Sequence, residues 1–364
     1  MSDAPSTVVN GRTAAPSLSP APPKAPTRKA PAKRTPPKKE PSKKAADQAV
    51  PSKTAARGGA SRAAKSYRAS VWPRNEALPP KLCKPVLDLQ GELDMPVMLL
   101  VQDPGSESPI SEMGDYLIHL IRHRRSGLPA NQPIALILNS AGGEARCAYG
   151  LARMIHRRCG GFTAVVPDVA MSAATLLTLG ADGILMGPDA SLGPLDAQVI
   201  DIETETYGSV LNEVQALERL RAYALESVDE TMQLLVTRTG KRVETLLPHV
   251  LKFVADSMQP LLNKIDVVHY NERARILKVG EEYAVRLLRR LHPLTSGRQD
   301  MARRIASTLV ESYPEHGFWI DREEARQIGL AVADTDDKLD AILQALWEGV
   351  QGITAIGMFE EATP

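Results

Sequence analysis

The residues best able to do chemistry in this chain are a serine and a glycine pair, each directly after a predicted buried strand. Ser172 follows the apolar run 161–169 and opens a short apolar helix, while Gly142 and Gly143 follow the run 132–140. A serine at a helix N-terminus commonly caps that helix. Glycines at a strand-to-helix turn expose backbone N–H groups and let a ligand approach closely, because no Cβ intervenes. Each feature alone is therefore compatible with a purely structural role.

Taken together, the two turns predict a site for acyl transfer. If the two strands are neighbours in one sheet, the N–H groups of Gly143 and Ala173 can converge on one acyl oxygen beside Ser172, which is how an oxyanion hole works. A serine nucleophile also needs a base within hydrogen-bond reach. We interpret Ser172 as the candidate nucleophile, with Gly142, Gly143 and Ala173 as the candidate oxyanion hole.

The elements that must position these residues alternate between strand and helix. Strands that are almost continuously apolar, separated by helices, are typical of a parallel sheet covered by helices. Such sheets bind ligands at the carboxyl ends of their strands. The predicted fold class is therefore α/β, built from parallel βα units. The strands are expected at 95–103, 132–140, 161–169 and 182–188, and the helices between them at 111–125, 144–158 and 172–181.

A helical section is predicted for residues 209–292, where the strand pattern disappears. Residues 213–240 and 271–292 have the pattern of long amphipathic helices with mixed charge. Further helices follow, and the last begins at a capping box formed by Asp321 and Glu324. We expect self-association, because these helices carry more apolar surface than one parallel sheet covers.

One string of residues carries a family resemblance. "AMSAATLLTLGADGILMGPDASLGPLD" (170–196), with "NSAGG" (139–143) roughly thirty residues before its serine, resembles the proteolytic subunit of the Clp protease and its crotonase-like relatives. It is most similar to the serine dehydrogenase proteinase family, and the resemblance extends roughly over 96–332. It implies a Clp-like fold and a serine peptidase that works through an acyl-enzyme. No cofactor and no metal are expected.

The resemblance also implies a Ser–Asp–His order along the chain. It assigns Ser172 as nucleophile, Gly143 and Ala173 as oxyanion donors, Asp196 as the carboxylate and His316 as the base. His316 would take the serine proton, and Asp196 would hold the imidazole tautomer.

The assignment of the carboxylate and of the base stays open at the level of sequence. Asp196 also suits a turn after a proline, and His316 also suits a loop beside a glycine. Spacing cannot choose the base, because triad partners meet in space and not at a fixed interval along the chain. The other candidate bases are His249, His269 and His292, or, for a Ser–Lys dyad, Lys241, Lys252, Lys264 and Lys278.

Charge divides the chain into two parts, predicted as a disordered basic tail at 1–68 and a peptidase domain at 69–364. The first 66 residues hold 14 Lys or Arg against 3 Asp or Glu, which leaves 30 basic and 40 acidic residues for the rest. A segment rich in Pro, Ala and Lys buries too little apolar surface to offset its ordering entropy. Its charge suits nucleic acid, an anionic membrane surface or an acidic partner, or it is a solubilising leader.

We expect a cytoplasmic serine peptidase acting on a peptide or protein substrate. No secretory signal and no stretch long enough for a transmembrane segment are visible. Cys83, Cys147 and Cys159 lack metal-ligand spacing and fit reduced thiols.

Two alternative functions remain. A crotonase-type acyl-CoA enzyme would use paired glutamates, which the turns around Gly143 and Ser172 do not offer. The other is a catalytically idle oligomeric scaffold whose basic tail binds nucleic acid or acidic partners.

Overall fold

The structure, a computed structural model, describes residues 65–362 except positions 104, 107, 197, 202–205 and 292–295. The described residues belong to one compact unit, Arg62–Pro364. The predicted tail at 1–68 lies outside the described residues apart from positions 65–68, and His292 also lies outside them.

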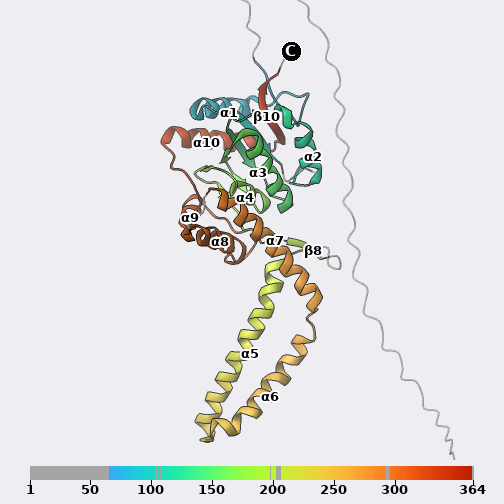
Figure 1. Cartoon of the computed structure of the whole chain (residues 1–364), viewed down its shortest axis with the longest axis vertical. Helices are drawn as coiled ribbons and strands as arrows, with labels where there is room; N and C mark the ends of the chain where they lie inside the picture. The colour runs from blue at the N-terminus through green and yellow to red at the C-terminus, as the bar shows by residue number, and fades with distance from the viewer. Residues whose placement is uncertain are drawn as a thin grey trace, which may run out of the picture. The chain divides into compact units, whose positions relative to one another are not determined.

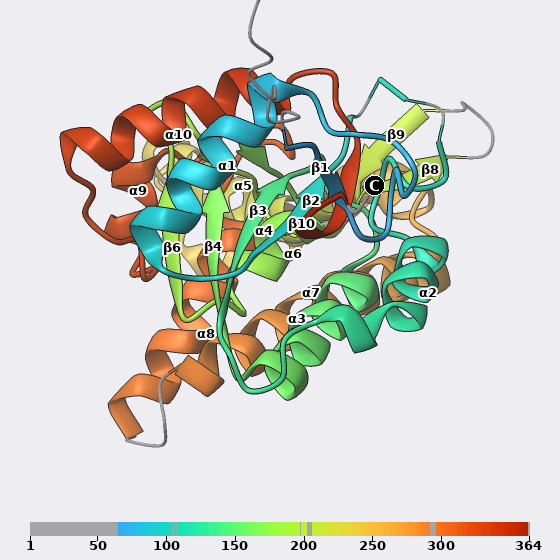
Figure 2. The same ribbon diagram turned by 90° about the horizontal axis from the view of Figure 1, so that it is seen from above.

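A six-stranded sheet with strand order β1-β10-β2-β3-β4-β6 lies at the centre of the α/β body, and its strands are labelled in the view from above (Figures 1 and 2). The four strands β2, β3, β4 and β6 are parallel, as the sequence predicts, so the α/β fold class is confirmed. The antiparallel edge of β10 and β1 was not predicted, because β10 comes from the far end of the chain. The strands are β1 (Tyr67–Ala69), β2 (Val97–Val101), β3 (Ile134–Asn139), β4 (Phe162–Val166), β6 (Gly183–Met186) and β10 (Ala355–Glu361).

Helices cover both faces of the sheet (Figure 2). Because successive strand residues point to opposite faces, Met98 and Leu100 of β2 pack into one core, and Val97, Leu99 and Val101 pack into the other. The face of Val97 is covered by α1 (Pro80–Leu93) and α10 (Asp337–Val350). The face of Met98 is covered by α2 (Asp115–His123), α3 (Ala145–Cys159), α4 (Ala173–Thr178), α7 (Val267–Leu291) and α8 (Ser296–Glu311).

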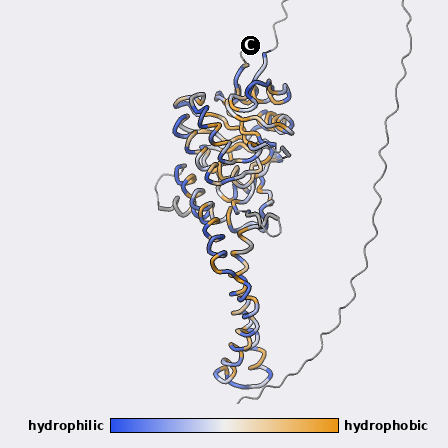
Figure 3. The backbone as a smooth tube through the Cα atoms, turned by 90° about the vertical axis from the view of Figure 1, so that its right-hand side faces the viewer, coloured by the Kyte–Doolittle hydropathy of each residue, from blue (hydrophilic) through white to orange (hydrophobic). Residues whose placement is uncertain are grey.

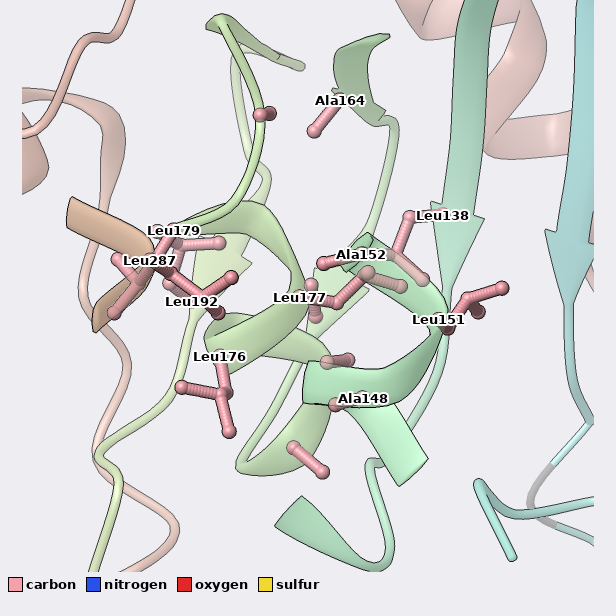
Figure 4. Close-up of a cluster of buried hydrophobic side chains, with 14 of the residues drawn as sticks. Leu138, Ala148, Leu151, Ala152, Ala164, Leu176, Leu177, Leu179, Leu192 and Leu287 are labelled. Carbon is pink, nitrogen blue, oxygen red and sulfur yellow. The ribbon is translucent and has the colours of Figure 1, made fainter. Parts of the chain in front are cut away.

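Small side chains bring α3 and α4 close to the sheet (Figure 4). Ala148 and Ala152 of α3 and Leu177 of α4 are fully buried, and they pack in one cluster with Leu138 of β3. The alanines let the two helices approach, and the leucines fill the space between them, so the core holds both candidate turns on a rigid base.

The predicted helical section is confirmed. Helices α5 (Val210–Thr239) and α6 (Val243–Leu262) form a hairpin that extends from the α/β body (Figures 1 and 3), and α7 returns to the body. We call α5 and α6 the helical hairpin. A short antiparallel ribbon, β8 (Gln198–Asp201) and β9 (Thr206–Ser209), precedes it.

Three further elements are short: β5 (Val169–Ala170) pairs with β7 (Ser191–Leu192), and α9 (Arg322–Gln327) follows the predicted capping box. Asp321 accepts a hydrogen bond from the Glu324 N–H at 2.8 Å, which confirms Asp321 as the N-cap residue of this helix. Among the described helices, none combines the length and the apolar character needed to cross a bilayer.

Candidate active site

The turn after β3 is held in place by backbone and buried side-chain hydrogen bonds. Met113 donates from its N–H to Gly142 O at 2.8 Å and accepts from the Glu144 N–H at 2.7 Å. The N–H of Gly143, which lies between these two residues, takes no part in these hydrogen bonds. Ser140 Oγ accepts from the Gly142 N–H at 3.0 Å and donates to Gln102 Oε1 at 2.6 Å. The polar pair Ser140 and Gln102 is almost fully buried, and sequence reasoning missed its role.

Both glycines are required by the backbone. Gly142 and Gly143 have φ values of +110° and +134°, which L-residues with a side chain rarely adopt. A Cβ on Gly142 would lie 2.6 Å from Met171 O and 2.9 Å from Ser172 Cβ. The glycine turn is thus in direct contact with the serine turn, as the sequence predicts for neighbouring βα units.

Ser172 has an unusual backbone, with φ 51° and ψ −118°. It occupies the N-cap position of α4, yet its side chain makes no capping hydrogen bond. Such sparsely populated conformations cost of order 1–3 kcal/mol and gather at functional sites. A strained strand-to-helix turn is also how hydrolase folds expose a nucleophilic serine. In the described part of the chain the hydroxyl makes no hydrogen bond, so it is available to a ligand.

Two backbone donors belong to residues that line the same cavity as Ser172. Gly143 and Ala173 both line it, and no acceptor among the described residues takes the N–H of either. Ala173 is the first residue of α4, where a backbone N–H has no intrahelical partner. The N–H of Gly142 is used by Ser140 Oγ, so of the three oxyanion candidates Gly142 holds the turn and does not offer a free donor.

Asp196 and His316 meet although 120 positions separate them: His316 Nδ1 lies 2.8 Å from Asp196 Oδ1. A short bridge brings them together, because Leu192 and Ile320 exchange two backbone hydrogen bonds of 2.9 Å. Leu195 N–H also donates to Leu309 O of α8 at 2.7 Å. The Asp196 side chain is 3% exposed. The segment before it is held by Ile320 through Leu192 and by Leu309 through Leu195.

Ser209 is a neighbour of the site that sequence reasoning missed. It is the N-cap residue of α5, and its hydroxyl donates to Asp196 Oδ2 at 2.8 Å. The two carboxylate oxygens of Asp196 therefore have different partners, His316 on one and Ser209 on the other. In the sequence, Ser209 is only a serine directly before a long predicted helix. A helix N-cap explains such a serine, so the sequence did not indicate a contact with Asp196.

These groups surround one cavity of about 840 Å³. Ser172, Asp196 and His316 all line it, together with aliphatic side chains of α4 and α7 such as Leu176, Ile276 and Val279. The walls are largely apolar, with a few converging polar groups, as is usual for a small-ligand or peptide subsite.

The alternative bases do not line this cavity in the described part of the chain. Lys252 and His249 lie on α6, and Lys241 lies just before it. Lys278 of α7 is bound to Glu281 at 2.6 Å, and this carboxylate raises the pKa of Lys278. A raised pKa keeps the amine protonated and makes it a poor base. The remaining candidates in the described chain, His269 and Lys264, likewise lie outside the lining.

Glu144, which lines the cavity, lies near Asp115 and Cys147, and the ligand atoms of these three side chains are close enough together to consider a metal. Arg146 already occupies the two carboxylates, at 2.6 Å from each. Burial, followed by the nearby carboxylates, raises the pKa of the Cys147 thiol to about 11. Metals bind the thiolate, so a thiol protonated at neutral pH and two carboxylates paired with arginine disfavour a metal here.

Residues 115–260 match the family model described as ClpP-like SDH-type serine proteinase. The predicted family resemblance is confirmed. The matched segment contains Gly143, Ser172 and Asp196, whereas His316 lies beyond it, and the family is one of serine proteinases.

Two curated relatives come from Methanocaldococcus jannaschii. Uncharacterized protein MJ0137 is 26% identical over 204 residues, which is 56% of this chain and 54% of that protein. Uncharacterized protein MJ1495 is 35% identical over 71 residues, 20% of this chain and 24% of that protein. The chain therefore spans about half the length of the first of these relatives and about a quarter of the second.

Among solved structures, ClpP1 from Listeria monocytogenes is 13% identical with a TM-score of 0.31, covering 69% of this chain and 98% of that chain. A point mutant of the same ClpP1 is 20% identical with a TM-score of 0.23, covering 43% of this chain and 81% of that chain.

Proposed function

We propose that this protein is a serine peptidase in which Ser172 is the nucleophile, His316 the general base and Asp196 the residue that orients the base. The observation that carries the proposal is the common cavity, which is lined by Ser172, His316 and Asp196 together with Gly143 and Ala173. The hydrogen bond from His316 Nδ1 to Asp196 supports the roles of these two residues. It leaves Nε2 as the nitrogen with a free lone pair.

In the acylation step, Ser172 Oγ attacks the carbonyl carbon of a peptide bond and His316 Nε2 accepts the hydroxyl proton. The negative charge that develops on the carbonyl oxygen is stabilised by the N–H groups of Gly143 and Ala173. The C–N bond then breaks, and the imidazolium gives its proton to the leaving amine. The product is an ester between Ser172 and the acyl part of the substrate.

In the deacylation step, water attacks the ester carbonyl while His316 accepts one of its protons. The C–O bond to Ser172 breaks, the proton returns to Ser172 Oγ, and the carboxylic acid leaves. Asp196 stays ionised throughout and stabilises the imidazolium without taking its proton. Because Asp196 is buried and fixed by two partners, the imidazole needs little reorganisation during the reaction.

A crotonase-type reaction is less well supported. Two glutamates, Glu112 and Glu144, do line the cavity, which the sequence did not suggest. Glu144, however, is bound to Arg146 at 2.6 Å and is therefore not a free base. The idle-scaffold alternative predicts a serine that does not react.

Labelling with a fluorophosphonate, followed by peptide mass spectrometry, tests the proposal. We expect the parent protein to carry the label on Ser172 and Ser172→Ala to carry none. His316→Ala should react at least about a thousandfold more slowly, as when a triad base is removed. His269→Ala serves as a matched control, because His269 lies outside the cavity lining.

Undiminished labelling of Ser172→Ala would contradict the choice of nucleophile. Undiminished labelling of His316→Ala would contradict the choice of base. An unlabelled parent protein would favour the idle scaffold.

We also propose that the protein self-associates through the helical hairpin. An apolar groove of about 420 Å³ runs between α5 and α6, and Leu225, Leu251 and Met258 line it. Leu225 is 61% and Leu251 49% exposed. Exposed apolar patches of this kind mark protein–protein contacts, and a second copy of the same hairpin offers an equally apolar face. Sedimentation at micromolar concentration is expected to show an oligomer, and a monomer would contradict this.

A further inference from the structure

A second hollow, whose lining shares no residue with the catalytic cavity, lies between α2 and α3. It encloses about 980 Å³, and cationic side chains dominate its lining. We call it the basic hollow. Its charged and titratable lining residues are Arg122, Arg125, Arg153, Arg157 and Arg158, with His119, His123 and Tyr149. No carboxylate belongs to this lining among the described residues.

The arginines of the basic hollow are not neutralised by the protein. Within the described chain none of the five forms an ion pair, and all five are exposed. Arg158 donates only to the Leu128 carbonyl at 3.1 Å, and Arg153 lies over the Tyr149 ring at 5.5 Å. Arg146, near the start of α3, is by contrast held by two carboxylates. The same helix thus carries one paired arginine and a group of unpaired ones.

Helix stabilisation accounts for only part of this cluster. Cations near a helix C-terminus interact favourably with the helix dipole, which gives a reason for Arg122 on α2 and for Arg157 and Arg158 on α3. The helix dipole gives no reason for Arg153, because this residue lies in the middle of α3. Guanidinium groups that line one hollow repel each other, and a bound polyanion would relieve that repulsion.

We propose that the basic hollow binds the phosphodiester backbone of a nucleic acid. The guanidinium fork matches phosphate oxygens bidentately, and the cluster consists of arginine without lysine. Arg153 and Arg157 are four residues apart, so they lie next to each other on one face of α3, about 5–6 Å between Cβ atoms. A duplex presents one negative charge per about 1.7 Å of its axis, so this row meets several phosphates at once.

Other occupants fit the hollow less well. The chain's own tail has the same positive sign. Membrane-surface helices add exposed Trp, Phe or Leu to their cations, and protein interfaces have an apolar core. The lining of the basic hollow contains none of the large exposed apolar side chains of the described chain. Tyr149 and Met154 belong to the lining, but five of its ten residues are arginines. A concave surface with this density of positive charge resembles a nucleic-acid interface.

Fluorescence anisotropy with a labelled DNA duplex of about 20 base pairs, measured from about 50 to 200 mM salt, tests this proposal. The full-length chain is used throughout, so the tail contributes equally to every variant. The test variant is Arg153→Gln/Arg157→Gln. The matched control, Arg238→Gln/Arg242→Gln, removes the same charge from exposed positions at the far end of the hairpin. Fluorophosphonate labelling of both variants at the parental rate shows that the fold is intact.

We expect the test variant to bind about tenfold or more weakly at the lowest salt, while the control binds like the parent. The slope of log affinity against log salt should fall by about 2, one for each phosphate contact removed. Equal affinity of the two variants would overturn the proposal and assign any binding to the tail. A parent protein that does not bind would also overturn it. Changed sedimentation of the test variant, with unchanged DNA binding, would identify a contact between copies instead.

Discussion

In the α/β body, strands β2 and β3 bury every residue, whereas Tyr223, Leu251 and Phe253 of the helical hairpin are 57%, 49% and 59% exposed. The body carries two continuous cores, one on each face of the sheet. The hairpin has one small cluster around Val250, Val254 and Met258. The body can therefore hold a site rigidly by itself, while much of the apolar surface of the hairpin is available to another chain.

The difference lies in what surrounds each helix. A helix on a sheet meets a broad apolar surface and is covered along its whole inner side. In the helical hairpin, α6 packs mainly against α5, and α5 packs against α6 and α7. Neither helix has a sheet beneath it, so part of each apolar stripe stays in water. We expect substitutions in the two regions to act differently, on folding in the body and on association in the hairpin.

The largest effect is expected for Leu177→Ala in α4, which is fully buried beneath the serine turn. Loss of this side chain leaves a cavity in a close-packed core and should lower the free energy of unfolding by about 2–5 kcal/mol. The matched change Leu234→Ala in α5, where the leucine is 48% exposed, should cost less than about 1 kcal/mol. Urea unfolding followed by circular dichroism measures both. Similar costs for the two leucines would contradict the contrast between the regions.

A smaller effect, on association alone, is expected for Phe253→Glu in α6. A charge in place of an exposed aromatic side chain should weaken hairpin-mediated assembly by about 2 kcal/mol, because aromatic anchors dominate many interfaces. Tyr116→Glu in α2, at a side chain that is 53% exposed, is the control. Analytical ultracentrifugation over a concentration series measures the shift. An unchanged dissociation constant for Phe253→Glu would remove this position from the interface.

The smallest effect is expected at the junction of body and hairpin, where Ser209 donates to Asp196 just before α5. Ser209→Ala removes the hydrogen bond that positions the carboxylate, and we expect fluorophosphonate labelling of Ser172 to slow about tenfold, with no loss of folding. Ser209→Thr keeps the hydroxyl and should restore the rate. Ser257→Ala removes a hydroxyl that donates to a backbone carbonyl within α6 at 2.8 Å, and it should have no effect.

If Ser209→Ala reacts at the parental rate, Ser209 is only a helix cap. If Ser257→Ala slows the reaction to the same extent, the hairpin affects the site through its stability and not through this hydrogen bond.

Local patterns along the chain were sufficient to predict the central strands and both candidate turns. Near-continuous apolar runs predicted β2, β3, β4 and β6, because a strand buried on both faces needs apolar residues at every position. The Gly142–Gly143 pair and Ser172 could be singled out, because a turn after a buried strand restricts which residues fit. The helix start at Asp321 was equally local.

Contacts between distant segments, by contrast, became visible only in the folded chain. The bridge between Leu192 and Ile320 brings His316 to Asp196, and no spacing along the sequence encodes that encounter. The β10 edge and the basic hollow were hidden for the same reason. Each of them brings together elements that are distant in sequence. Taken singly, those elements have residue patterns that ordinary core packing or helix capping already explains. Local propensity selects the elements, whereas side-chain partners from distant segments are chosen by the way those elements pack.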